Sequence, residues 1–157
     1  MQLKKYAAMK SRIHILLVFS LMLLLPALGH GQCKNFAKKV CRLELSPYIH
    51  DGNYNAAILT EGEEAELFKT FYAGQEYRMA VCGSESLPKV EFTVMTVDRK
   101  VIYSNASNGY ASNWTFNVEA TQQLIVVVKV PSAASSSDDD ELCSGCVSIM
   151  FGLKIDA

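Results

Sequence analysis

The stretch 147-VSIMFGLKI-155 places a large apolar side chain at every second position. In an extended chain Val147, Ile149, Phe151, Leu153 and Ile155 point to one side, and the residues between them point to the other. A period of two with one continuous apolar face is typical of a β-strand that packs on a core. The stretch therefore predicts a C-terminal strand with one face in a hydrophobic core.

The same period recurs through much of the preceding chain. In residues 76–82, EYRMAVC, the side chains of Tyr77, Met79 and Val81 alternate with Glu76, Arg78 and Ala80. Residues 124–130, LIVVVKV, are apolar on both faces, as expected of a central strand. Polar or glycine-containing turns separate these segments at intervals of about 8–12 residues. The other predicted strands are 43–48, 56–60, 67–72, 90–94, 101–103 and 113–119.

Eight or nine strands at this spacing predict an all-β protein built as an antiparallel β-sandwich. Between the strands no run of about 10–15 residues keeps a helical period, which disfavours a parallel α/β architecture. One short helix is expected before the strands. It falls in residues 33–42, where Phe36, Ala37, Val40 and Cys41 are apolar at helical spacing.

The N-terminal residues have the composition of a targeting segment. Four basic residues, Lys4, Lys5, Lys10 and Arg12, precede the apolar run 13–25. Pro26 and the small residues of 27–31 follow, which predicts a signal peptide over 1–31 that is cleaved before Gln32. A membrane anchor is the alternative, but a spanning helix needs about 20 apolar residues. A lipid on Cys33 is disfavoured because Gln32, not a small residue, precedes it.

Cleavage at that point leaves residues 32–157, which is the size of a single domain. The signal segment takes four of the 15 basic residues and none of the 16 acidic ones, so the remainder carries a net charge of −5. An acidic surface repels phosphate backbones, so nucleic acid is not an expected partner. Residues 131–143, PSAASSSDDDELC, are predicted to form a flexible acidic loop.

Five cysteines, at positions 33, 41, 82, 143 and 146, favour disulfides in an oxidising compartment. Two disulfides and one odd cysteine can be drawn in 15 ways, from five choices of the odd residue and three connectivities. Cys41 and Cys82 are the expected long-range pair. Cys146 is expected either to bridge locally to Cys143 or to tie the last strand to another part of the chain.

No catalytic or metal-binding pattern is recognisable in the predicted domain. His50 is its only histidine, and no Gly-x-Ser-x-Gly motif is present. The CSGC sequence at 143–146 has the spacing of half a zinc site, but a second ligand pair is missing. The acidic run 138–141 lacks the alternating ligands of a calcium loop, so a solvated loop is expected. The sequence therefore predicts a non-enzyme without cofactor or metal.

Aromatic residues beside an asparagine-rich loop give the candidate ligand site. Tyr103, Asn108 and Tyr110 belong to the segment 103–112, YSNASNGYAS, and an aromatic platform bordered by amides suits stacking on sugar rings. Trp114 is in phase with Phe116 and Val118, so it is expected in the core. Asn105 and Asn113 head glycosylation sequons, which matter only in a host that glycosylates them.

Several stretches resemble bacterial pre-peptidase C-terminal domains. The stretches are EGEEAELFKTFYAGQEYRMAVCG at 61–83, VEFTVMTVDRKVIYSN at 90–105, WTFNVEATQQLIVVVKV at 114–130 and CVSIMFGLKI at 146–155. The chain also resembles a group of small secreted bacterial proteins of unassigned function with a similar AGQEYR stretch and closing strand. The first resemblance implies a jelly-roll-like sandwich with a non-catalytic accessory role. The chain departs from that family in its cysteines and in having no attached protease.

The sequence thus favours a secreted or periplasmic, non-catalytic β-sandwich that binds a macromolecule, a glycan or an envelope component. Membrane contact is expected only through the signal peptide. Two main alternatives remain open: a structural or adhesive surface protein, and a thiol-redox protein that uses Cys143 and Cys146. A small hydrolase is a third and weaker alternative.

Overall fold

A computed structural model describes residues 29–132 and 142–155. The described residues from Gln32 onward form one compact unit. In the part of the chain that the structure describes, the helix α2 (Gly29–Lys39) and the 3₁₀ helix η1 (Cys41–Leu45) are followed by nine strands. The strands are β1 (Ile49–His50), β2 (Asn55–Thr60), β3 (Glu64–Phe71), β4 (Glu76–Gly83), β5 (Glu91–Thr96), β6 (Val101–Ser104), β7 (Asn113–Asn117), β8 (Gln122–Lys129) and β9 (Ser144–Leu153), with the 3₁₀ helix η2 (Ala106–Asn108) between β6 and β7.

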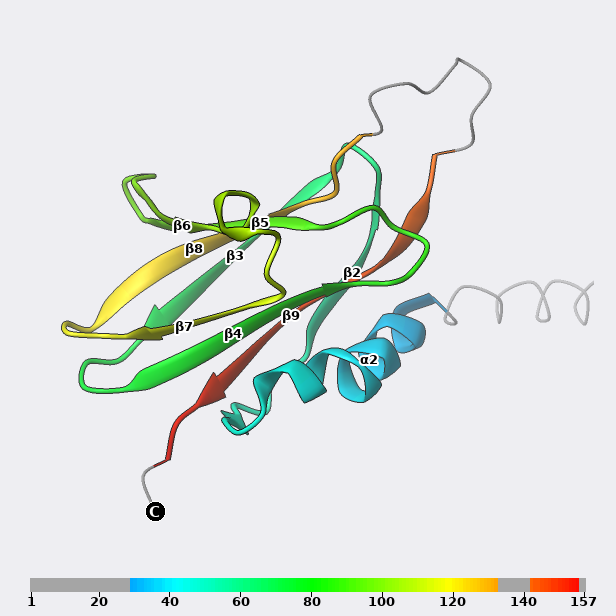
Figure 1. The fold of residues 1–157 in the computed structure, drawn as a ribbon. Helices are drawn as coiled ribbons and strands as arrows, with labels where there is room; N and C mark the ends of the chain where they lie inside the picture. Colours follow the sequence, from blue (N-terminus) through cyan, green and yellow to red (C-terminus); the bar gives the residue numbers. More distant parts are fainter. Residues whose placement is uncertain (1–28, 133–141, 156–157) are drawn as a thin grey trace, which may run out of the picture. The chain divides into compact units, whose positions relative to one another are not determined.

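The strands form two antiparallel sheets that face each other (Figure 1). Sheet A has the order β1-β9-β4-β7, with β2 also paired to β9, and sheet B has the order β3-β8-β5-β6. The chain passes from β2 in sheet A to β3 in sheet B and back to β4, and it crosses again between β7, β8 and β9. This interleaving is the strand order of a jelly roll. The prediction of an all-β antiparallel sandwich with a jelly-roll-like arrangement is confirmed.

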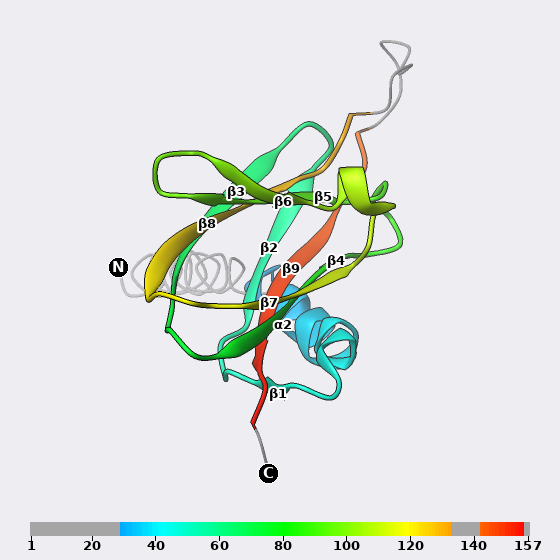
Figure 2. The ribbon, with the colours of Figure 1, turned by 60° about the vertical axis from the view of Figure 1, so that its left-hand side comes forward.

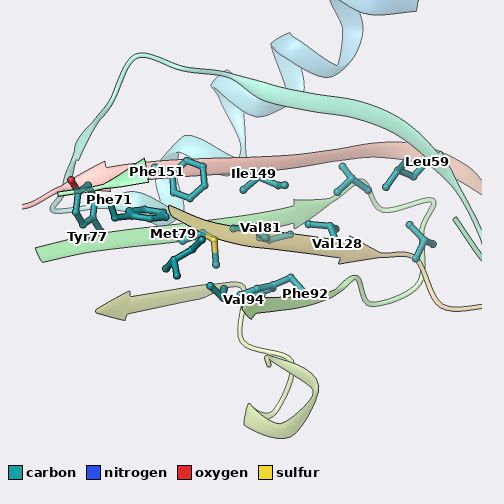
Figure 3. Packing of buried hydrophobic residues seen from close by; sticks show 14 of the residues in the cluster. Leu59, Phe71, Tyr77, Met79, Val81, Phe92, Val94, Val128, Ile149 and Phe151 are labelled. Carbon is teal, nitrogen blue, oxygen red and sulfur yellow. The ribbon is translucent and has the colours of Figure 1, made fainter. Parts of the chain in front are cut away.

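The core lies between the sheets and uses the predicted alternation (Figure 3). Met79 and Val81 of β4 meet the apolar face of β8, Leu124, Val126 and Val128, and all five side chains are at most 4% exposed. At one end Phe71 makes edge contacts with Tyr77 and Phe151, at ring-centroid distances of 5.0 and 5.6 Å. Burying each such side chain stabilises the fold by about 1.5–3 kcal/mol.

The outer face of sheet A is covered by the N-terminal helical segment (Figures 1 and 2). Cys33, Ala37, Cys41 and Leu45 recur every four residues and are all at most 3% exposed. Ala37, Cys41 and Leu45 pack on Ala80 and Met150, which are fully buried on the side of β4 and β9 that faces away from sheet B. A Cβ on Gly152 would lie 2.7 Å from the Cβ of Tyr48, so this strand position must lack a side chain.

The predicted strand 43–48 is wrong. Cys41–Leu45 is a 3₁₀ helix, and this part of the chain pairs with β9 only after the predicted strand ends, at Ile49–His50. In a strand Leu43 and Leu45 would share one face, but Leu43 is 72% exposed whereas Leu45 is 1% exposed. The four-residue spacing from Cys33 to Leu45 therefore outweighs the local preference for a strand. The predicted helix 33–42 is found as α2 and η1, and β3 begins at Glu64 rather than at residue 67.

Candidate functional site

The loop between β6 and β7 is built around a buried asparagine. Asn105 is 2% exposed, and its Oδ1 accepts a hydrogen bond of 2.8 Å from the backbone N–H of Phe92. Its Nδ2 donates to the carbonyls of Val90 at 3.1 Å and Ala111 at 3.4 Å. The amide thus ties both ends of the loop to the start of β5. Asn105 was singled out from the sequence only as a sequon, and its structural role was missed.

The backbone after η2 turns through two consecutive left-handed residues, Gly109 at φ 68° and Tyr110 at φ 58°. For a bulky residue such a positive φ costs about 1–3 kcal/mol. The backbone N–H of Tyr110 donates to the carbonyl of Asn105 at 2.9 Å, which helps to hold the strained conformation. Strained residues of this kind cluster at ligand sites, so the conformation marks Tyr110 as a candidate.

The Tyr110 side chain is 41% exposed and lines a cavity of about 370 Å³. Its hydroxyl donates to Glu91 Oε1 at 3.2 Å, and the Lys89 ammonium lies 5.6 Å from the ring centroid. The cavity lies between the end of β4 with the following loop 84–90, the β6–β7 connection, and the helical segment at Val40 and Glu44. Polar residues on its wall are Glu44, Ser84, Glu85, Lys89, Asn105 and Ser112.

Glu44 is fixed on the helical side of this cavity. Its Oε2 accepts hydrogen bonds from Ser112 Oγ at 2.8 Å and from Asn113 Nδ2 at 3.2 Å. These bonds join η1 to the beginning of β7. The cavity is therefore lined by carboxylates, an ammonium, hydroxyls and an aromatic ring, which is a set that can bind a polyhydroxylated or peptide-like ligand.

The structure separates the three predicted site residues. Only Tyr110 lines the cavity. Asn108 is exposed, and its Nδ2 donates to the carbonyl of Ser104 at 2.7 Å, so its amide stabilises the start of the loop. Tyr103 stacks on Trp114 at a centroid distance of 4.7 Å and an interplanar angle of 14°.

The Tyr103 ring belongs to an aromatic stack that leads into the core. Trp114 lies between Tyr103 and Phe116, whose centroid is 4.2 Å from that of Trp114. All three side chains pack against the main core. Burial raises the pKa of the Tyr103 hydroxyl above its usual range. The expectation that Trp114 packs with the core agrees with this arrangement.

Two disulfides join the helical segment to sheet A. Cys41 pairs with Cys82, as expected, with Cα atoms 5.6 Å apart. Cys33 pairs with Cys146, with Cα atoms 5.2 Å apart. Of the two alternatives for Cys146, the local bridge to Cys143 is wrong and the long-range bond is found. The CSGC sequence therefore does not form a disulfide of its own, because the helix that covers sheet A brings Cys33 to Cys146.

A second polar cluster was not predicted. Lys69 of β3 donates to Asp51 Oδ2 at 2.8 Å, and its ammonium lies 4.7 Å from the centroid of the Phe151 ring. Burial by itself raises the pKa of Asp51, but the hydrogen bonds from Lys69 and Asn53 and the charge of Lys69 outweigh it and lower the pKa. His50 Nε2 is 3.6 Å from Asp51 Oδ1. The cluster fastens β3 to the β1–β2 turn, and Lys69 gave no local sequence signal for it.

The remaining expectations concern metal sites, membrane-spanning helices and the two segments at 1–31 and 138–141. Within residues 29–132 and 142–155, no three His, Cys, Asp or Glu side chains gather closely enough to hold a metal ion. In the same ranges no helix has the length and apolarity to cross a bilayer. The predicted signal peptide, apart from residues 29–31, and the acidic run 138–141 lie outside the described residues.

Comparison with protein-family models and with curated proteins found no match. Among solved structures, the chain is similar to PliG of Aeromonas hydrophila, a periplasmic inhibitor of g-type lysozyme, at 14% identity over 69% of this chain and 89% of that chain, with a TM-score of 0.47. It is also similar to a de novo designed double-stranded β-helix at 14% identity over 65% of this chain and 99% of that one, with a TM-score of 0.29. The resemblance to pre-peptidase C-terminal domains stays a prediction.

Proposed function

We propose that this protein is a secreted or periplasmic, non-catalytic binding module that recognises a glycan or another envelope macromolecule at the Tyr110 cavity. The observation that carries the proposal is the half-exposed Tyr110 side chain on the wall of a cavity of about 370 Å³, at a position where the backbone adopts the left-handed conformation. Two disulfides between segments far apart in the chain support an oxidising, extracytoplasmic location.

The chemistry of the cavity wall favours a ligand with many hydroxyl groups. A tyrosine face gives apolar contact to the C–H side of a sugar ring. Ser84, Ser112, Lys89 and Glu44 offer donors and acceptors around it. Since Glu91 already accepts a hydrogen bond from the Tyr110 hydroxyl and Lys89 lies near the ring, the position of the side chain is set before a ligand arrives, which lowers the entropic cost of binding.

The rigid support of the loop favours a binding role over a purely structural one. The three hydrogen bonds of Asn105 hold the loop at both ends, so the site is carried by the sandwich itself. A structural or adhesive protein has no need of a strained aromatic residue beside a cavity. That alternative becomes the conclusion if no ligand is captured.

A glycan array and a pull-down from cell-envelope extract test the proposal. Wild-type protein is compared with Tyr110→Ala and with Tyr72→Ala. Tyr72 is the matched control because it is a 62% exposed tyrosine on another loop. Capture by the wild type and by Tyr72→Ala, with loss in Tyr110→Ala, is the expected result. Equal capture by all three variants, or no capture by the wild type, contradicts the proposal.

A further inference from the structure

The exposed surface of the helical segment has a charge opposite to that of the rest of the domain. Residues 29–50 contain four basic residues and one acidic residue, Glu44. Glu44 is half-buried and accepts hydrogen bonds from Ser112 and Asn113. In the remaining described residues ten acidic side chains stand against seven basic ones. The cations on this surface, all exposed, are Lys34, Lys38, Lys39 and Arg42; with Leu43 and Ile49 they are called the basic face below.

Apolar side chains stand among these cations. Leu43 is 72% exposed and Ile49 is 56% exposed. Leu43 follows Arg42 directly, and both residues line a hollow of about 480 Å³ together with Lys38, Pro47, Tyr48 and Ile49. The Tyr48 ring is held in the wall of the hollow by the Arg78 guanidinium, 4.5 Å from its centroid, and by the hydrogen bond of its hydroxyl to Glu76.

Exposed leucine and isoleucine have no role in binding a purely polar polyanion. A bilayer surface takes both kinds of group at once, because phosphate headgroups attract the cations and the acyl boundary accepts the apolar side chains. We propose that the basic face docks the protein on an anionic lipid surface, with Lys38 and Arg42 on headgroup phosphates and with Leu43 and Ile49 inserted beside them.

The helical segment that carries the basic face is held rigidly on sheet A. Cys33 and Cys41, on the opposite side of the same segment, are bonded to Cys146 and Cys82 of sheet A. The segment therefore binds without first having to fold. The more acidic remainder of the domain is repelled by the same lipids, which orients the molecule with the helical segment toward the bilayer. The inference concerns a different surface from the Tyr110 cavity and does not depend on a ligand there.

Flotation with vesicles of phosphatidylglycerol and phosphatidylcholine tests the proposal, with vesicles of phosphatidylcholine alone for comparison. All variants are made as the secreted protein, which is predicted to begin at Gln32, so the apolar run 13–25 is absent from each and cannot insert into the vesicles. Each basic residue near an anionic surface contributes about a fivefold increase in partitioning, so Lys38→Gln with Arg42→Gln should lower it about thirtyfold. The matched control is Lys100→Gln with Lys129→Gln, which removes the same charge from exposed positions of sheet B and its hairpin and should lower partitioning less than twofold.

The apolar part of the proposal has its own variant pair. Leu43→Ser should lower partitioning about tenfold, because the free energy gained when the leucine side chain leaves water for the acyl boundary is lost. Ile58→Ser, at a 55% exposed position on β2, should leave partitioning unchanged. Tyr110→Ala should also leave it unchanged, which separates this proposal from the one for the cavity.

Three results would overturn the inference: equal partitioning onto both kinds of vesicle, equal loss in the control pair, or no effect of Leu43→Ser. If poly-aspartate competes with the vesicles and Leu43→Ser is neutral, the basic face binds an acidic macromolecule and not a membrane. A melting temperature within about 2 °C of wild type for each variant is the control for folding, and it is expected because all the altered side chains are exposed.

Discussion

Two aromatic regions lie at the connection between β6 and β7, and they differ in packing and in exposure. On one side Tyr103, Trp114 and Phe116 stack face to face and pack on the core. On the other side Tyr110 stands half-exposed on a cavity wall with a strained backbone. The first region stabilises the sandwich, and the second is available to a ligand. Aromatic residues only a few positions apart can therefore serve stability and recognition separately.

The largest expected effect lies in the stack. Trp114→Ala should lower the free energy of unfolding by about 3 kcal/mol, because both stacking partners lose a contact and a cavity is left. The melting temperature should fall by roughly 10 °C in a calorimetric scan. Phe68→Ala, at a 53% exposed position on sheet B, serves as the control and should change stability by under about 1 kcal/mol. A harmless Trp114→Ala would mean that the two regions have been assigned the wrong way round.

Asn105 connects the two regions, and its replacement is expected to affect both. Asn105→Ala leaves the buried N–H of Phe92 and the partly buried carbonyls of Val90 and Ala111 without the Asn105 amide as partner, which should cost about 2–3 kcal/mol. Amide hydrogen exchange in residues 104–112 should accelerate. Asn108→Ala removes one bond of an exposed side chain and should cost less than about 1 kcal/mol. Equal effects of the two substitutions would refute the assigned role of Asn105.

The left-handed backbone conformation at Tyr110 is expected to lower the free energy of unfolding slightly. Glycine adopts a positive φ without the steric cost that a side chain meets there. The free energy of unfolding of Tyr110→Gly, measured by urea denaturation, should therefore be about 1 kcal/mol higher than that of Tyr110→Ala. If the alanine variant is the more stable of the two, the loop has no strain at this position.

The smallest effect is a pH dependence confined to the stack. Burial raises the pKa of Tyr103 in the folded state, so at alkaline pH the unfolded chain releases this proton first. Stability from this group is present below the usual tyrosine pKa, about 10, and is lost as pH rises through the folded value. Tyr103→Phe should remove this part of the alkaline loss, measured as melting temperature between about pH 9 and 11. An unchanged alkaline slope in Tyr103→Phe would show that Tyr103 ionises equally in both states.

The sequence predicted the sandwich because apolar side chains recur at every second residue in strands such as β4 and β9 and so form one continuous apolar face. It did not predict that their other face is covered. Ala80, Ser148 and Gly152 are small, which permits a helix to approach, but small residues are equally common on exposed faces. The cover depends on disulfides between residues 113 and 41 positions apart in the sequence. The Cys41–Cys82 pair was expected, but the pairing of Cys33 with Cys146 was not, because cysteine spacing alone leaves several connectivities open.

The candidate site was predicted only in part for a similar reason. Tyr110 follows Asn108-Gly109, a turn signal in a polar loop, so its exposure followed from local chemistry. Tyr103 and Asn108 have the same kind of neighbours, but their contacts are set by the register of β5 with β6 and by the buried Asn105. Glu44 and Lys89 reach the cavity from other parts of the chain. Their contribution arises only from the tertiary fold.

The most direct test of the central claim is a calorimetric titration of the best-captured glycan into wild type, Tyr110→Ala and Tyr72→Ala. Loss of an aromatic residue at the centre of a binding site costs about 2 kcal/mol, so the affinity of Tyr110→Ala should fall about thirtyfold. Its melting temperature should stay within about 2 °C of wild type, and Tyr72→Ala should bind as wild type does. An affinity of Tyr110→Ala equal to that of Tyr72→Ala would contradict the account, because the cavity would then not be the binding site.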